Sequence, residues 1–313
     1  MPIRIPNGLP AISVLQGEEV FVMTEDRALH QDIRPLNLLF LNLMPKKVKT
    51  EIQYMRRLSN TPLQVNITLM RVDDHESRNT PAEHLRTFYK SFEDVKDENF
   101  DGMIVTGAPL DQLAFSEVSF WPRLAEIISW SATHVMSTYF SCWGVAAALK
   151  VFYGLDPVFR KHKLSGIFGE NTAKNSFDTL IRGFDDHFLA PQSRYIDFTR
   201  SFITENTDLT VLADGTESGV YLAVSPDRRQ VYVTGHPEYD ATTLADEYRR
   251  DRSAGINPEL PVNYFPGDDP SKEPPLTWRS HSSILFSNWL NYYVYQLTPY
   301  DLKSITPMGI TQL

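Results

Sequence analysis

Short apolar runs alternate with segments of helical spacing over the first half of the chain. Runs typical of buried strands occupy residues 36–44, 63–72, 100–106 and 133–140. Apolar residues at helical spacing follow at residues 47–58, 81–89, 117–131 and 145–151. Strand–helix alternation with short connections predicts right-handed βαβ units and a parallel sheet. We therefore expect an α/β fold of three layers, with helices on both faces of a mostly parallel sheet.

The second half of the chain is less regular. Residues 154–205 show turn signals but little periodicity, and three short strands are predicted after them, at 209–213, 219–225 and 230–234. A helix at 242–252, a proline-rich loop at 255–278 and an aromatic helix at 282–296 complete the prediction. We expect one α/β domain at 36–300, an N-terminal arm at 1–35 that lies over the domain or a partner subunit, and a C-terminal tail at 301–313.

Composition narrows the classes of function. The 313 residues carry a net charge of −9 with acidic and basic residues interleaved, so nucleic-acid binding is not expected. The N-terminus lacks an apolar signal sequence and no apolar run could cross a bilayer, which predicts a cytoplasmic protein without membrane contact. One cysteine excludes a disulfide framework. Ligand spacings for a metal and glycine-rich nucleotide motifs are absent, so no metal and no bound cofactor are expected.

Cys142 stands between a predicted strand and a predicted helix. This is where nucleophile elbows hold their reactive atom, and a helix N-terminus beneath it favours a thiolate. Free cysteine is also among the most buried residue types, so a structural thiol explains this stretch equally well. The stretch alone leaves the two interpretations open.

A second candidate site follows the predicted strand at 230–234, where His236 and Glu238 flank a proline. A histidine can take the proton of a cysteine, and an acid on the other ring nitrogen orients the histidine. An oxyanion needs two N–H donors, for which we expect the backbone amides of Trp143 and Leu110. These residues fit acyl transfer through a Cys–His–Glu triad.

Several longer motifs carry a resemblance to a known family. They lie at residues 1–4, 41–47, 77–85, 100–102, 105–110, 182–186, 235–240, 264–266, 278–281 and 288–293. The elbow and the His-x-Glu motif resemble the class I glutamine amidotransferase superfamily, whose fold is flavodoxin-like. Within it, the chain is much more similar to the homoserine O-succinyltransferases and their O-acetyltransferase relatives, almost from end to end.

The resemblance implies acyl transfer from acyl-CoA to the hydroxyl of L-homoserine in methionine biosynthesis. It assigns Cys142 as the nucleophile that forms an acyl-thioester, His236 as the general base and Glu238 as its orienting acid. A thioester intermediate implies ping-pong kinetics. The same resemblance implies a homodimer.

Substrate-binding positions of the family match Lys163, Ser193 and Arg250. Arg250 suits the homoserine carboxylate as a two-pronged donor. Lys46 is a further candidate near the site. Residues 166–178 depart from the family pattern, so Lys163 is a safer assignment than the positions just after it.

Asp111 occupies the position that the resemblance connects with the choice of acyl donor. Family members with glycine at this position use succinyl-CoA, and those with glutamate use acetyl-CoA. The aspartate of this chain matches neither group. A carboxylate would repel the distal carboxylate of succinyl-CoA, yet the rest of the chain resembles the succinyl-using members, which slightly favours succinyl-CoA. Alternatives are an O-acetyltransferase, an acyltransferase that accepts serine, a glutamine amidotransferase-type hydrolase and a non-enzymatic binding module.

Overall fold

The computed structural model describes residues 3–17, 22–24, 34–72, 80–174, 176 and 178–308, and all structural statements concern these residues. Parts of the predicted arm (1–2, 18–21 and 25–33), the motif residues 77–79 and the end of the predicted tail (309–313) lie outside them.

The described strands form a twelve-stranded sheet in the order β2-β1-β4-β3-β6-β7-β12-β11-β10-β8-β9, with β5 beside β4. Its parallel part contains β1 (Ile3–Ile5), β2 (Val22–Thr24), β3 (Leu36–Leu41), β4 (Val65–Met70), β5 (Tyr89–Lys90), β6 (Phe100–Val105), β7 (Val135–Ser141) and β12 (Gln230–Val233). The predicted buried strands are confirmed, and β7 lies between β6 and β12. The carboxyl ends of these strands therefore meet at one edge of the sheet.

The remaining strands are antiparallel: β8 (Val158–Thr172), β9 (His187–Asp197), β10 (Thr210–Gly215) and β11 (Gly219–Val224). Irregular structure across 154–205 is therefore a wrong prediction, because β8 and β9 pair along most of their length. The first half of β8 is largely exposed and carries Arg160, Lys161, His162 and Lys163. A strand with that composition lacks the apolar pattern that identifies buried strands.

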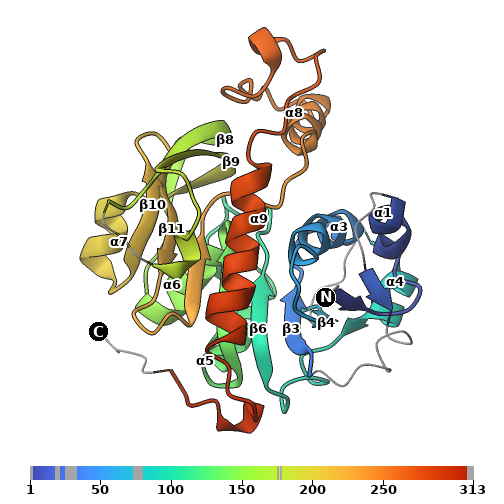
Figure 1. Ribbon diagram of the computed structural model, residues 1–313. Coiled ribbons are helices and arrows are strands. Elements are labelled where there is room, and N and C mark those ends of the chain that lie inside the picture. The colour runs from blue at the N-terminus through green and yellow to red at the C-terminus, as the bar shows by residue number, and fades with distance from the viewer. Residues whose placement is uncertain are drawn as a thin grey trace.

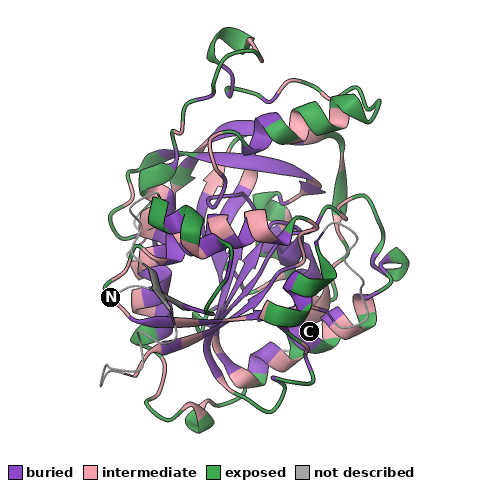
Figure 2. Cartoon of the chain, turned by 90° about the vertical axis from the view of Figure 1, so that its right-hand side faces the viewer, coloured by how far each residue is buried: buried purple, intermediate pink, exposed green. Residues whose placement is uncertain are grey.

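Helices cover both faces of the sheet (Figures 1 and 2). They are α1 (Ala11–Gly17), α3 (Lys47–Leu58), α4 (Ala82–Phe88), α5 (Trp121–His134), α6 (Trp143–Tyr153), α7 (Arg200–Asn206), α8 (Thr243–Ser253) and α9 (Arg279–Asn288), which continues as a π-helix at Trp289–Tyr295. Short 3-10 turns lie at Phe115–Glu117, Thr179–Ile181, Pro266–Asp268 and Leu302–Ser304.

Strand β3 shows how the layers form. Leu38 and Phe40 pack in one core with residues of α1, α3 and α9, whereas Leu39 and Leu41 pack in a second core with residues of α5 and α6. Successive side chains of a strand point to opposite faces, so an apolar run of this kind needs a helix layer on each side. The predicted three-layer α/β architecture is confirmed.

The described part of the N-terminal segment belongs to the sheet edge. Strand β1 pairs with β4, and Ile5, Leu9 and Leu15 are buried in the core that α3 shares. Strands of three residues are too short to show periodicity. The division into arm, domain and tail at residues 35 and 300 stays a prediction.

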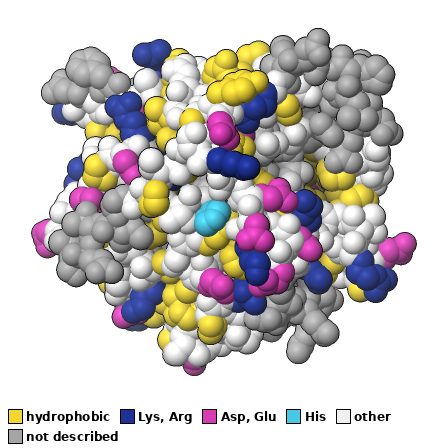
Figure 3. Space-filling model, turned by 90° about the horizontal axis from the view of Figure 1, so that it is seen from below, with side chains coloured by type: hydrophobic (Ala, Val, Ile, Leu, Met, Phe, Trp, Pro, Cys, Tyr) yellow, Lys and Arg dark blue, Asp and Glu magenta, His cyan; other side chains and the backbone are white. Residues whose placement is uncertain are grey.

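The surface agrees with the charge pattern of the sequence. On the face seen from below, acidic and basic side chains lie among one another (Figure 3). Of the helices in the described ranges, none combines the length and apolar character that crossing a membrane requires.

Candidate active site

Cys142 lies at the turn between β7 and α6 with backbone angles of φ 49° and ψ −114°. L-residues rarely adopt this conformation, and holding one there costs about 1–3 kcal/mol. The turn is fixed because the Cys142 N–H donates to the carbonyl of Val233 at the end of β12, at 2.8 Å. Its side chain is 6% exposed. A strained, buried turn at the head of a helix is the geometry of a nucleophile elbow, which favours the catalytic interpretation over a structural thiol.

His236 and Glu238 follow β12, the strand beside the cysteine strand. The His236 N–H donates to the carbonyl of Pro191 on β9 at 2.9 Å, and its Nδ1 lies 2.7 Å from Oε1 of Glu238. The other ring nitrogen is thus left for the hydrogen bond that His236 shares with Cys142. Burial acts to lower the pKa of His236, but the charges of Cys142 and Glu238 and its bonds to both raise that pKa well above the ordinary value. The raised pKa therefore favours an imidazolium on His236, beside Cys142.

The backbone N–H groups of the two predicted oxyanion donors, Trp143 and Leu110, differ in their hydrogen bonding. Trp143 is the first residue of α6, where a backbone N–H has no acceptor within its own helix. The Leu110 N–H donates to the carbonyl of Ala108 at 2.8 Å. The turn that contains Leu110 does lie beside the elbow, since a Cβ on Gly107 would be 3.2 Å from Cβ of Cys142. A role for Leu110 would require this local bond to open, and both donors stay predictions.

Cys142 opens into a cavity of about 280 Å³. Its walls include six of the predicted site residues, namely Asp111, Cys142, Lys163, Ser193, His236 and Arg250. These residues come from six separate segments: the loop after β6, the elbow, strand β8, strand β9, the turn after β12 and helix α8. Glu238 lies behind His236 and is buried. The structure thus brings together in one cavity the substrate-binding positions that the resemblance assigned.

A partly buried carboxylate, Glu247 of α8, connects the substrate-binding residues. Its Oε2 accepts from Ser193 Oγ at 2.5 Å and lies 3.2 Å from Lys163 Nζ. Its Oε1 accepts from the hydroxyl of Tyr239 at 2.7 Å. Burial acts to raise the pKa of Glu247, but the charge of Lys163 and the bonds from Ser193 and Tyr239 outweigh it and hold the pKa below the ordinary value. Glu247 is therefore an anion at neutral pH.

Asp111 is held against strand β9. Its Oδ2 accepts a hydrogen bond from the Tyr195 N–H at 2.6 Å. Burial raises the pKa of Asp111, and its hydrogen bonds and the charges of Lys163 and His236 oppose that rise. The carboxyl group lines the cavity of Cys142, so it is in reach of an acyl group bound there.

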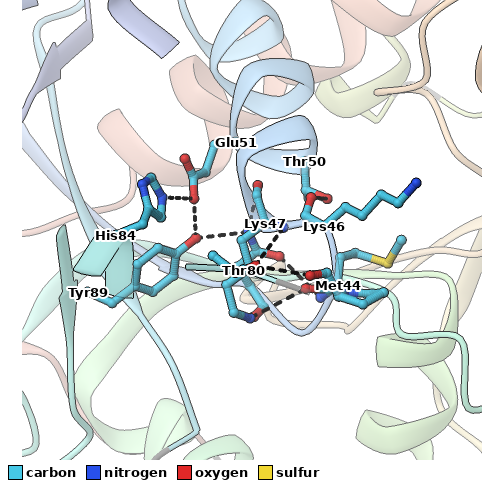
Figure 4. A network of polar contacts seen from close by, with 10 residues as sticks. Met44, Lys46, Lys47, Thr50, Glu51, Thr80, His84 and Tyr89 are labelled. Atoms are coloured by element: carbon cyan, nitrogen blue, oxygen red, sulfur yellow. Dashed lines mark hydrogen bonds and ion pairs between the residues drawn. The ribbon is translucent and has the colours of Figure 1, made fainter. Parts of the chain in front are cut away.

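Lys46 is exposed and does not line this cavity. Its side chain runs away from the polar contacts that its neighbour Lys47 joins (Figure 4). Lys47 is buried and donates to the carbonyls of Asn42 at 2.5 Å and Met44 at 3.4 Å. Burial lowers the pKa of Lys47 to about 8. Met44 lines the cavity, so Lys47 supports its wall from behind, and a substrate-binding role for Lys46 stays a prediction.

Sequence reasoning missed Glu247 and Tyr239 as site residues. Tyr239 stands inside the motif at 235–240, and its ring stacks on His236 with centroids 4.1 Å apart. Glu247 lies three residues before Arg250, the spacing that puts two side chains on one helix face. His281, which lies in the motif at 278–281, does not line the cavity; it packs on Phe188 and lies 3.2 Å from Asp185.

Metal ligation finds no support in the described part of the chain, where no group of three or more His, Cys, Asp or Glu side chains is arranged to hold an ion. The expectation that neither a metal nor a bound cofactor takes part stays a prediction.

Solved structures share this fold. A glutamine amidotransferase from Thermotoga maritima superposes with a TM-score of 0.54, covering 84% of this chain and 100% of that chain at 13% sequence identity. The chain thus has an α/β fold like that of this glutamine amidotransferase, as expected.

Sequence comparison gives the family. Residues 2–300 match the family described as homoserine O-succinyltransferase. A homoserine O-acetyltransferase from Succinatimonas hippei is 68% identical over 300 residues, which cover 96% of this chain and 99% of that protein. A homoserine O-succinyltransferase from Tolumonas auensis is 58% identical, covering 97% of this chain and 96% of that protein. The chain belongs to the homoserine O-succinyltransferase family and is a homoserine O-acyltransferase.

Proposed function

We propose that this protein moves an acyl group from acyl-CoA to the hydroxyl of L-homoserine through a thioester on Cys142. The observation that carries the proposal is the strained elbow of Cys142 facing His236, whose Nδ1 lies 2.7 Å from Glu238. A buried thiolate beside an oriented imidazolium can attack a thioester without a metal or a bound cofactor.

In the first half-reaction the Cys142 thiolate attacks the thioester carbonyl of acyl-CoA. The carbon–sulfur bond to CoA breaks, and the leaving thiolate takes the proton of the His236 imidazolium. Cys142 then carries the acyl group and His236 is neutral. The amide of Trp143 is placed at the helix start to stabilise the oxyanion, as a positioned backbone donor.

In the second half-reaction neutral His236 takes the proton of the homoserine hydroxyl, whose oxygen attacks the Cys142 thioester. The O-acyl ester leaves, and the thiolate–imidazolium pair is restored. Arg250 is the donor for the homoserine carboxylate, because a guanidinium can bind it in two-pronged fashion. Lys163 and Ser193, both bonded to Glu247, complete the acceptor side of the cavity.

The acyl donor is the finer part of the proposal. Whole-chain resemblance slightly favours succinyl-CoA, but the Asp111 carboxyl lines the cavity and lies on the Tyr195 amide. An anion there repels the second carboxylate of succinyl-CoA, and the relative at 68% identity is named as an acetyltransferase. We therefore propose acetyl-CoA as the preferred donor and succinyl-CoA as the alternative.

Steady-state kinetics test the proposal. Initial rates with homoserine and either acetyl-CoA or succinyl-CoA should give parallel double-reciprocal lines, as in a ping-pong reaction. Mass spectrometry after incubation with acyl-CoA alone should find the acyl mass on Cys142. Intersecting lines together with an unmodified Cys142 would indicate direct transfer of the acyl group, without a thioester on the enzyme. Ammonia release from glutamine, which we expect to be absent, would indicate the hydrolase alternative. A higher kcat/KM for serine than for homoserine would identify serine as the preferred acceptor.

A further inference from the structure

A second cavity, of about 370 Å³, opens beside the catalytic one. The two cavities share the residues Lys163, Tyr195, Glu247, Asp251 and Ile256. Their common wall is thus the junction between β8, β9 and the end of α8. In Figure 1, α8 and the loop after it project beyond the body of the domain, next to β8 and the start of α9. A molecule bound at Cys142 can therefore extend through this junction without leaving the protein surface.

The far wall of the second cavity is built by the loop at 256–262. This loop is fastened to β8, because the Val262 N–H donates to the Ser165 carbonyl at 2.9 Å and the Ile167 N–H donates to the Val262 carbonyl at 2.8 Å. Gly166 has φ +145°, and a Cβ on it would lie 2.3 Å from the Val262 carbonyl oxygen. Only glycine permits the loop to lie this close to the strand. The wall is therefore a formed part of the fold.

Three carboxylates line this cavity, and each lies in an ion-pair contact: Glu247 and Asp251 with Lys163, and Glu259 with His162. The remaining lining suits a long, neutral chain that carries amides. Asn257 and Tyr248 offer polar groups, while Pro258, Leu260 and Pro261 offer apolar surface. The volume falls within the range of about 300–1,000 Å³ for small-molecule sites. Lys161 and His162 stand at the β8 side, and His162 lies 3.3 Å from Glu259 on the loop. Lys161 is exposed and carries a positive charge at this side.

We propose that this second cavity binds the pantetheine chain of the acyl-CoA donor, with the diphosphate of its nucleotide end toward Lys161. The inference rests on the proposed function. An acyl-CoA places its thioester carbonyl at Cys142 and its acyl group near Asp111, and its thiol substituent leaves through the junction of the two cavities. The second cavity, beyond Lys163 and Glu247, receives that substituent.

The shared junction has a kinetic consequence. Lys163 and Glu247 line both cavities, so the pantetheine chain and homoserine cannot occupy the junction together. A ping-pong reaction needs no simultaneous occupancy, since CoA leaves before homoserine enters. Free CoA should therefore compete with homoserine.

The test compares acyl-CoA with the same acyl group on N-acetylcysteamine, a short thioester that lacks most of the pantetheine chain and the whole nucleotide. Asn257→Trp fills the second cavity from an exposed loop. It should raise the KM for acyl-CoA by about tenfold or more and leave kcat/KM for the short thioester within about twofold. Glu273→Trp is the matched control, because Glu273 is exposed and lines neither cavity. It should leave the KM for acyl-CoA and the kcat/KM for the short thioester unchanged.

A second variant and a direct binding measurement complete the test. Gly166→Ala displaces the loop at Val262 and should also raise the KM for acyl-CoA without changing the kinetics of the short thioester. Calorimetry measures the binding of free CoA to Cys142→Ala protein. This binding should be weaker when the protein also carries Asn257→Trp. An unchanged KM for acyl-CoA in Asn257→Trp would overturn the inference, as would an equal loss with both thioesters. If wild-type protein turns over neither acyl-CoA, it is the proposed function that fails.

Discussion

The ring of Tyr239 stacks on the imidazole of His236, with centroids 4.1 Å apart and planes inclined by 19°. The hydroxyl of the same tyrosine donates to Glu247, the carboxylate that also binds Ser193 and Lys163. One side chain thus joins the catalytic base to the substrate-binding cluster.

Tyr239→Phe should separate these two roles. The ring still stacks on His236, but Glu247 loses one hydrogen bond, a loss of about 1–2 kcal/mol or roughly five- to thirtyfold. We expect the KM for homoserine to rise by that factor while the rate of Cys142 alkylation by iodoacetamide stays close to wild type. Tyr239→Leu, which removes the stack as well, should raise the KM for homoserine and also slow the alkylation of Cys142. A fall in alkylation for Tyr239→Phe would show that the hydroxyl serves the base.

Cys142→Ala should abolish acyl transfer, lowering kcat by at least about a thousandfold, because no other side chain can form the thioester. Circular dichroism should show an unchanged fold. Cys142→Gly should be equally inactive but more stable than Cys142→Ala by about 1 kcal/mol, since glycine adopts φ 49° without strain. The comparison of the two melting temperatures checks the elbow geometry independently of activity. Equal or lower stability for the glycine variant would argue against a strained turn.

Glu238→Gln should lower the pKa of His236, because the carboxylate is one of the charges that raise it. A histidine whose folded pKa is raised contributes stability that is complete below its ordinary value of 6.5 and is lost as pH rises through the raised value. In the variant this loss should be complete at lower pH, and kcat should fall by about a hundredfold or more. An NMR titration of the His236 ring measures the shift. Asp185→Asn, beside His281, is the control that should leave the titration unchanged.

Asp111→Gly should move donor preference toward succinyl-CoA, because it removes a carboxyl that lines the acyl cavity. Each tenfold change in the ratio of kcat/KM values corresponds to about 1.4 kcal/mol, and we expect at least that. Asp111→Glu keeps the charge and should keep the preference for acetyl-CoA. The check is kcat/KM for both donors on three proteins, and an unchanged ratio in Asp111→Gly would refute the role of this position.

Lys163→Met should raise the pKa of Glu247, because the lysine charge is the main group that holds it below the ordinary value of 4.5. A carboxylate with a depressed pKa contributes stability that is present above 4.5 and is lost as pH falls through the folded value. The acid limb of kcat/KM for homoserine should therefore move to higher pH. Lys150→Met, at an ion pair on α6 remote from the cavity, should leave the profile in place.

The sequence by itself determined the order of elements in the parallel half of the sheet and the position of the elbow. Apolar runs and helical spacing are local properties, and they led to α3 with both of its ends correct. A cysteine between a strand and a helix, and a His-x-Glu motif after another strand, could be assigned to one sheet edge because parallel strands share their carboxyl ends. Each of those conclusions depends on residues close together in the chain.

Only the tertiary structure decided what surrounds the triad. Strands β8 and β9 escaped detection because polar residues interrupt any apolar period, although most of β9 is buried. These two strands supply Lys163, Ser193 and the amide that holds Asp111. Glu247 meets Lys163 and Ser193 across 84 and 54 residues of chain, a contact that no local pattern encodes. The Leu110 amide was expected to be open and is bonded to Ala108. A site assembled from distant segments is decided by packing, because local spacing says nothing about which side chains converge.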